Sequence, residues 1–203
     1  MRRLLDLAEA EIAKMLSEGA ERACALLDAA VRAYAEGGPS SPLRDAASEL
    51  HKLHDSVAEL VLEAVARFSP MATDLRFMRA ALFASYDIYR IARYAYDIAA
   101  AAERLGGGCP SQRVAEVASH VKSMLTAAVY MLTNRDLSRY EEVKNMDDEV
   151  DRAYEAAIDS LLRRVDRCAV LEAMALRLLE RASDHAVYIA NHSKYLVTGE
   201  LAH

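Results

Sequence analysis

Glycine and proline, the residues that most often interrupt helices, are confined to a few places in this chain. The seven glycines and four prolines gather chiefly in the loops at 37–42 and 106–111 and beside the step from Ser69 to Pro70. Glycine disfavours the interior of a helix through its backbone entropy, and proline does so through its missing N–H group. The long segments between these places are therefore free to form continuous helices.

The apolar residues of these segments recur every three or four positions, as one buried face of a helix requires. The spacing is plain from Leu4 to Leu16 and again from Val143 to Leu161. It predicts six helices, near residues 2–36, 43–68, 71–105, 112–133, 137–164 and 168–198. We expect Ser69 to cap the third helix, with Pro70 at its first position. The loops are short, which favours antiparallel neighbours and hence helix bundles.

The third and sixth predicted helices resemble each other. Arg90 and Ile98 of the third match Arg181 and Ile189 of the sixth at a constant offset of 91 positions, and Ala95 and Ala99 match Ala186 and Ala190. The loop at 106–111 lies near the midpoint of the chain, where the boundary of a repeat is expected. The sequence thus predicts an all-α fold of six helices in two tandem three-helix bundles, spanning 1–105 and 112–203.

Composition and charge exclude several classes of protein. Hydrophobic residues make up 53% of the chain, which is enough to build a core. The formal net charge is −6, and the sequence has no basic stripe of the kind that a nucleic-acid binder needs. No run of apolar residues is long enough to span a membrane, and acidic residues interrupt the N-terminal segment where a secretory signal would lie. We therefore expect a cytoplasmic protein that binds no nucleic acid.

The three cysteines point to the same compartment. Cys24, Cys109 and Cys168 are odd in number, far apart in the sequence and outside any C-x-x-C motif. This usage is typical of a reducing compartment rather than of a disulfide framework. We expect three unpaired thiols.

Two pairs of acidic residues in the second half form the strongest candidate site. Asp147 and Asp151 are four residues apart on the fifth predicted helix, and Glu180 and Asp184 have the same spacing on the sixth. Like charges at this spacing destabilise a helix by about 0.2–0.5 kcal/mol. A shared cation would reverse that effect, and oxygen ligands suit Mg, Ca, Mn or Fe. The alternative interpretation is that these carboxylates are solvated or paired with arginines.

The first half carries a different set of candidate ligands. His51, His54 and Asp55 share one face of the second predicted helix, a spacing that could hold zinc, nickel or copper. The alternative is a polar surface cluster without a ligand. The positions that match Glu180 and Asp184 in the repeat are occupied by Tyr89 and Arg93, which cannot form a pair of carboxylate ligands.

Three segments resemble those of PhoU-like proteins, the regulators of phosphate uptake. The segment from Pro70 to Arg76 is similar to P-x-A-x-D-L-R, and the segment 180–189 is similar to E-R-I-G-D-x-x-x-x-I. The stretch 147–155 resembles D-x-x-V-D-x-x-Y-E. The resemblance implies two three-helix bundles, a cytoplasmic location and a role as an adaptor between a phosphate-specific ABC transporter and a membrane sensor histidine kinase. Contact with the membrane would come only through these partners, and we expect a homodimer.

The resemblance also implies a metal site, because the acidic motifs of the family bind metal ions, in some members as multinuclear iron clusters. The ligands implied here are Asp147, Asp151, Glu180 and Asp184, with Glu155 as an additional one, around a divalent or trivalent ion such as Fe, Mn, Mg or Zn. The first bundle is expected to have lost this cluster, or to hold a different ion through the histidine set.

Enzyme signatures such as the P-loop, G-x-G-x-x-G, G-x-S-x-G and H-E-x-x-H do not occur in the sequence. We therefore predict a regulatory protein rather than an enzyme. Three alternatives stay open at this point: a carboxylate-metal enzyme on a helical scaffold, a regulator of another ion transporter, and a structural oligomerisation module.

Overall fold

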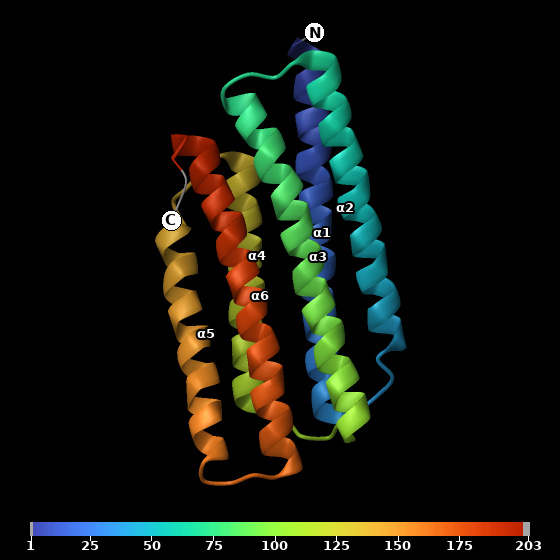
Figure 1. Ribbon diagram of the computed structural model, residues 1–203, viewed down its shortest axis with the longest axis vertical. Coiled ribbons are helices and arrows are strands. Elements are labelled where there is room, and N and C mark those ends of the chain that lie inside the picture. Colours follow the sequence, from blue (N-terminus) through green and yellow to red (C-terminus); the bar gives the residue numbers. More distant parts are fainter. Residues whose placement is uncertain (1, 201–203) are drawn as a thin grey trace.

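The computed structural model describes residues 2–200, and within that range it contains six α-helices and no strand. Their bounds are α1 Arg2–Glu36, α2 Ser41–Phe68, α3 Thr73–Leu105, α4 Gln112–Asn134, α5 Tyr140–Leu161 and α6 Arg167–Thr198 (Figure 1). The prediction of an all-α fold with six helices is confirmed. The last three residues of the predicted second bundle, 201–203, lie outside the described part of the chain.

The helices form two three-helix bundles, α1–α3 and α4–α6, which lie side by side (Figure 1). The most extensive contact between any two helices joins α3 to α6, and α1 also packs against α4. Within the described range, α2 touches only α1 and α3, and α5 touches only α4 and α6. Four central helices therefore share one core, and each outer helix belongs to a single bundle.

The core follows the predicted apolar spacing. Ile12, Leu16 and Leu27 of α1 are fully buried, and burying a side chain of this size stabilises the fold by roughly 1.5–3 kcal/mol. Helices α3 and α6, which make the most extensive contact, are both rich in buried alanines. The separation of two packed helices depends on their side chains, and these alanines are Ala84, Ala92, Ala95 and Ala99 of α3 and Ala182, Ala186 and Ala190 of α6.

The helix ends differ from the prediction in a few places. Ser69 does not cap the start of α3; it ends α2 in the left-handed conformation (φ 47°, ψ 57°), and its N–H donates to the Val65 carbonyl. A turn follows, so α3 begins at Thr73. The fifth helix is shorter at both ends than predicted, while Asp166 caps α6 by accepting a hydrogen bond from the Ala169 N–H at 3.0 Å.

The prediction of three unpaired thiols is wrong. Cys109 and Cys168 form a disulfide, and only Cys24 is free among the described cysteines. The two paired residues are far apart in sequence, but α4 and α6 run in the same direction within their bundle, so both helices begin at the same end. Sequence separation carries no information on this proximity. The cysteines therefore give no support for a reducing compartment.

No helix within residues 2–200 combines the length and the apolar character needed to cross a bilayer.

Candidate functional site

The two acidic pairs of the second half lie on neighbouring helices, α5 and α6, which pack against each other along their length (Figure 1). We call Asp147, Asp151, Glu180 and Asp184 the acidic cluster. The charge of Asp184 acts on the other three carboxyl groups and raises the pKa of each. The fold thus brings the two predicted pairs within electrostatic reach of one another.

The pKa of Asp147 is raised above its ordinary value. Burial is the main cause, and the carboxylates of Asp151, Asp184 and Asp148 add to it, against an opposing contribution from the Ser183 hydroxyl. One oxygen of Asp147, Oδ1, is buried and has no hydrogen-bond partner. Leaving a buried polar atom unpaired costs about 1–3 kcal/mol, and more when the group is charged. This carboxyl group therefore favours either a proton or a cation beside it.

The pKa values of Asp151 and Glu180 are also raised. Desolvation raises the pKa of Asp151, and the neighbouring carboxylates, including Glu155, add to this effect. Desolvation is likewise the main cause of the raised pKa of Glu180, followed by the charge of Asp184. Burial and mutual repulsion therefore both disfavour the charged forms of these three carboxyl groups.

Two arginines supply positive charge beside these carboxyl groups. Arg177 Nη1 lies 2.7 Å from Glu180 Oε2, although this oxygen has no hydrogen bond of proper geometry. Arg181 Nη1 lies 3.4 Å from Asp184 Oδ2. Both arginine side chains are more than two-fifths exposed, and ion pairs of this kind are worth little in water. Neither is paired with Asp147.

The side chains of the acidic cluster are of the chemical type that binds a hard cation. All four predicted ligands, and Glu155 beside them, offer carboxylate oxygens, which suit Mg, Mn or Fe. Within the described residues, however, no three His, Cys, Asp or Glu side chains are already arranged around one point as a coordination sphere requires. A bound ion would need side-chain rotation at this site, with Arg177 and Arg181 turning away from the carboxylates.

The histidine set of the first bundle is arranged differently. The ring centroids of His51 and His54 are 6.3 Å apart, and the rings pack against Tyr89 and Tyr86. Asp55 is exposed, and its charge is felt by His54, whose pKa is nonetheless lowered because of burial. The structure therefore brings the two imidazoles near each other within an aromatic cluster, and does not add the carboxylate as a third ligand.

His54 is held by a serine of α3. Ser85 Oγ lies 2.8 Å from His54 Nδ1 and 2.8 Å from the Leu82 carbonyl oxygen. The hydroxyl group of Ser85 therefore links the imidazole to the backbone of α3. Arg93, at the position that matches Asp184, pairs with Asp97 at 3.2 Å. The counterpart of the acidic cluster in the first bundle is thus aromatic and partly cationic.

The sequence reasoning missed a buried polar cluster between the bundles. Asp87 of α3 is 5% exposed and accepts a hydrogen bond from His185 Nδ1 of α6 at 2.7 Å. His192 Nε2 lies 3.6 Å from the other oxygen of Asp87. The two partners are 98 residues apart in the chain, and no motif in the sequence links them.

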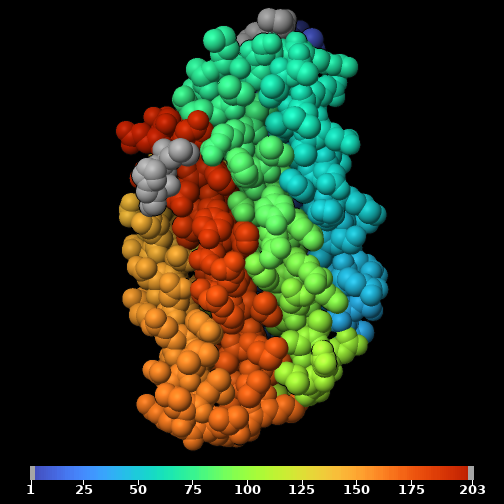
Figure 2. Space-filling model, viewed as in Figure 1, coloured from blue at the N-terminus to red at the C-terminus, as the bar shows by residue number. Residues whose placement is uncertain are grey.

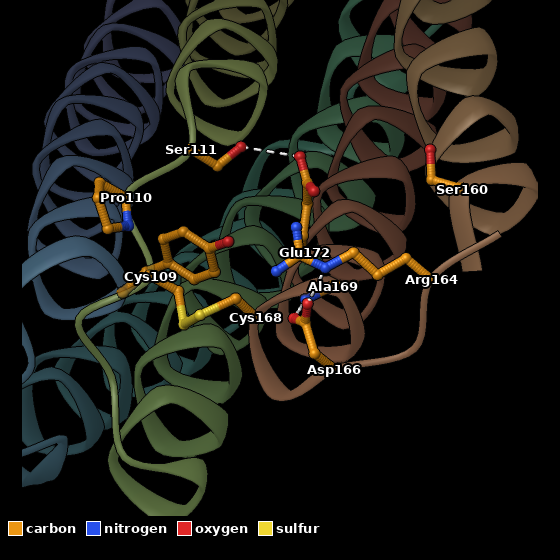
Figure 3. Close-up of a pocket in the computed structure, with 10 residues that line it drawn as sticks. Cys109, Pro110, Ser111, Ser160, Arg164, Asp166, Cys168, Ala169 and Glu172 are labelled. Carbon is orange, nitrogen blue, oxygen red and sulfur yellow. Dashed lines mark hydrogen bonds and ion pairs between the residues drawn. A yellow bond between two sulfur atoms is a disulfide. The ribbon is translucent and has the colours of Figure 1, made fainter.

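A pocket of about 260 Å³ lies at the disulfide end of the second bundle (Figure 3). The disulfide, Tyr34 of α1 and Glu172 of α6 line it, and Ser111 Oγ donates to Glu172 Oε1 at 2.8 Å. Burial, followed by the charge of Glu172, raises the pKa of Tyr34 to about 12, so this phenol stays protonated. The pocket thus lies between α1 of the first bundle and the N-terminal ends of α4 and α6.

The fold and the site define a helical protein of two tandem three-helix repeats, with a carboxylate cluster on the second repeat. The PhoU domain family model matches residues 16–102 and 114–192, one match in each bundle. The chain belongs to the PhoU family, and the resemblance noted from its motifs is confirmed.

Relatives and solved structures agree with this assignment. The chain is 34% identical over 181 residues to a "Phosphate-specific transport system accessory protein PhoU homolog" of Synechocystis, covering 83% of this chain and 80% of the relative. A homologue of the same name from Pseudomonas aeruginosa is 29% identical over 175 residues, covering 81% and 72%.

The crystal structure of PhoU from Pseudomonas aeruginosa superposes with a TM-score of 0.77 at 25% identity, covering 98% of this chain and 97% of that one. The regulatory protein PhoU from Streptococcus pneumoniae has the same fold, with a TM-score of 0.77 at 18% identity and coverage of 99% and 97%. These relatives are named as accessory or regulatory proteins, and the family assignment confirms the prediction that the chain is not an enzyme.

Proposed function

We propose that this chain is a non-catalytic regulator of phosphate uptake that acts as an adaptor on a phosphate-specific ABC transporter, a sensor histidine kinase, or both. Membership of the PhoU family supports this role, because its relatives are named as accessory proteins of phosphate-specific transport systems. The protein would act in the cytoplasm, reach the membrane only through these partners and form a homodimer.

The proposal includes a metal ion at the acidic cluster. The observation that carries it is the buried, unpartnered Oδ1 of Asp147, whose pKa is raised by burial and by neighbouring carboxylates. Asp147, Asp151, Glu180 and Asp184 would hold the ion, with Glu155 as an outer ligand. The ion would supply positive charge and a link between α5 and α6.

This link offers a physical basis for regulation. Helix α5 contacts only α4 and α6 within the described residues, so its position depends on few neighbours. Four carboxylates without an ion repel one another across the α5–α6 contact, and a bound cation reverses this effect. Loading of the site would therefore set how firmly α5 lies on α6, and with it the shape of the surface that the two helices present.

Metal analysis of protein purified without chelator tests the site. We expect Fe, Mn, Mg or Zn in a defined ratio to protein, and a loss of that metal in the double variant Asp147→Ala, Glu180→Ala. The matched control is Glu141→Ala with Asp159→Ala, which removes two exposed carboxylates of α5 outside the cluster. Metal-free protein, or equal loss in the control, would refute the metal site.

Phosphate uptake tests the regulatory role separately. Cells that lack this chain should take up more phosphate through the phosphate-specific transporter than cells that contain it, and the purified chain should co-purify with a transporter or kinase component. Unchanged uptake together with no such association would refute the adaptor role, whatever the metal content.

A further inference from the structure

An apolar groove lies between α5 and α6, beside the acidic cluster. Its volume is about 420 Å³, and its walls are formed by Tyr154, Ile158 and Leu161 of α5 and by Val170 and Met174 of α6, among others. Ile158 is 40% exposed and Met174 is 43% exposed, so large apolar side chains reach the surface here. Figure 2 shows a face of the molecule on which α5 and α6 lie next to each other.

Among the residues that the structure describes, Arg177 is the one charged residue that lines the groove, and its guanidinium already has partners. Its guanidinium lies over the ring of Tyr154, 5.4 Å from the centroid, and pairs with Glu180. The groove therefore offers an apolar floor, and Arg177 marks the border between this floor and the acidic cluster.

The outer wall of the groove is strongly acidic. Helix α5 contains eight Asp or Glu residues against two Lys or Arg, which gives a formal charge of −6, equal to that of the whole chain. Three exposed carboxylates lie within a turn of the lining residues: Asp151, Glu155 and Asp159. An occupant that buries apolar side chains here would therefore bring positive charge beside them.

Three kinds of occupant are possible: a second copy of the chain, a lipid surface and a segment of another protein. The negative charge of α5 favours the third. A second copy of the chain, docked through the same face, would bring two α5 helices of charge −6 together, and like charges at an interface cost several kcal/mol. An anionic lipid surface would be repelled for the same reason. A basic segment of another protein meets complementary charge.

The length of the groove matches a short helix. The lining residues of α5 run from Tyr154 to Leu161, a separation of seven positions or about 10.5 Å along the axis. This is the distance between positions i and i+7 of another helix, whose apolar anchors recur at i, i+3 or i+4, and i+7.

We propose that the apolar groove between α5 and α6 receives an amphipathic helix of a partner protein, with two or three apolar anchors flanked by Lys or Arg. The inference rests on the proposed adaptor role for the partner's biological identity. None of the residues that line the groove is a proposed metal ligand, so the groove is tested in both metal-loaded and metal-free protein.

Binding of a model helix tests the groove directly. The probe is a fluorescent, stapled helical peptide of about 15 residues, with Leu at i, i+4 and i+7 and Lys on the flanking positions; a second peptide carries Glu in place of Lys. We expect the Lys peptide to bind in a fluorescence anisotropy titration, more weakly at high salt, and the Glu peptide to bind at least about tenfold more weakly.

Substitutions locate the binding. Met174→Glu and, separately, Ile158→Glu should weaken binding of the Lys peptide by about tenfold or more. Leu62→Glu is the matched control, because Leu62 is a 64% exposed leucine on α2, far from the groove in the fold. Asp159→Lys should weaken binding of the Lys peptide and strengthen that of the Glu peptide. Equal effects of the groove variants and the control would overturn the proposal.

The natural occupant is tested in cells with a photo-crosslinking amino acid at position 158 or 174, and at position 62 as control. Crosslinks from 158 and 174 to a basic amphipathic segment of a transporter or kinase component would support the proposal. Crosslinks to a second copy of this chain, to lipid, or to a segment without this pattern would overturn it.

The outcomes separate this inference from the proposed function. If Met174→Glu leaves peptide binding intact while the chain still restrains phosphate uptake, the docking site is refuted and the adaptor role stands. If the peptide binds at the groove but uptake does not respond to the chain, the adaptor role is refuted and the docking site stands. Metal content should be the same in Met174→Glu as in the unsubstituted protein.

Discussion

Asp87 of α3 accepts a hydrogen bond of 2.7 Å from His185 Nδ1 of α6, and this contact joins the two bundles where they touch most extensively. Both side chains are buried. The pair is therefore a buried polar link between the two bundles.

Removing one partner of this pair should destabilise the protein. Asp87→Ala leaves the His185 N–H group buried without an acceptor, at an expected cost of about 1–3 kcal/mol in the free energy of unfolding. Urea unfolding of Asp87→Ala, His185→Ala and the double variant gives the coupling energy between the two side chains. A double variant that loses the full sum of the single losses would show that the two side chains do not interact.

The acidic cluster predicts a pH dependence of stability in metal-free protein. The pKa of Asp147 is raised in the folded state, so folding favours its protonated form. Its favourable contribution is therefore fully present below its ordinary pKa of about 3.8 and is lost as pH rises through the raised value. We expect Asp147→Asn to stabilise the metal-free protein at neutral pH and to flatten the fall in stability with rising pH. Asp159→Asn, on the exposed side of α5, is the control, and an equal gain there would contradict the prediction.

The disulfide should contribute strongly to stability. It closes a loop between positions 59 residues apart, for which the chain-entropy model gives about 4 kcal/mol. Cys109→Ser, or reduction by a dithiol, should lower the melting temperature, whereas Cys24→Ser alters a free thiol and should have a much smaller effect. Thermal melts with and without reductant measure this, and the reductant should not affect Cys109→Ser. A melting temperature that is indifferent to reductant in the unsubstituted protein would rule out the contribution.

Two glycines should respond to alanine in opposite directions. A Cβ atom on Gly107 would lie 2.7 Å from Gly37 Cα, because the loop between the bundles crosses the loop after α1 at van der Waals contact. Gly107→Ala should cost about 1–3 kcal/mol, since backbone must move. Gly19 lies inside α1, and a Cβ atom there would make ordinary contacts of 3.4 Å or more, so Gly19→Ala should gain up to about 1 kcal/mol. Chemical unfolding of both variants checks the signs.

The sequence was sufficient to predict the helices and the repeat, because glycine and proline at the helix ends and the spacing of apolar residues within the helices are local signals. It failed where two distant segments meet. Ser69 and Pro70 carry the pattern of a helix start, but the chain reverses direction there and Ser69 ends α2 instead. The Cys109–Cys168 bond and the Asp87–His185 contact join residues 59 and 98 positions apart, and nothing local in the sequence marks either.

The candidate site was predictable in its residues but not in its electrostatics. The spacing of Asp147, Asp151, Glu180 and Asp184 placed each pair on one helix face, and the family resemblance implied that the pairs meet. The burial of Asp147 Oδ1 depends on how closely α6 covers α5, which is a property of packing. The aromatic surroundings of His51 and His54 likewise arise from side chains on α3.

The outer helices α2 and α5 each touch only the two inner helices of their own repeat within residues 2–200. A change on the outward surface of one repeat therefore leaves the other repeat mechanically undisturbed, while the four inner helices hold the shared architecture constant. The two halves can therefore present different chemistry on one scaffold. Tyr89 and Arg93 stand in the first repeat at the positions that Glu180 and Asp184 occupy in the second.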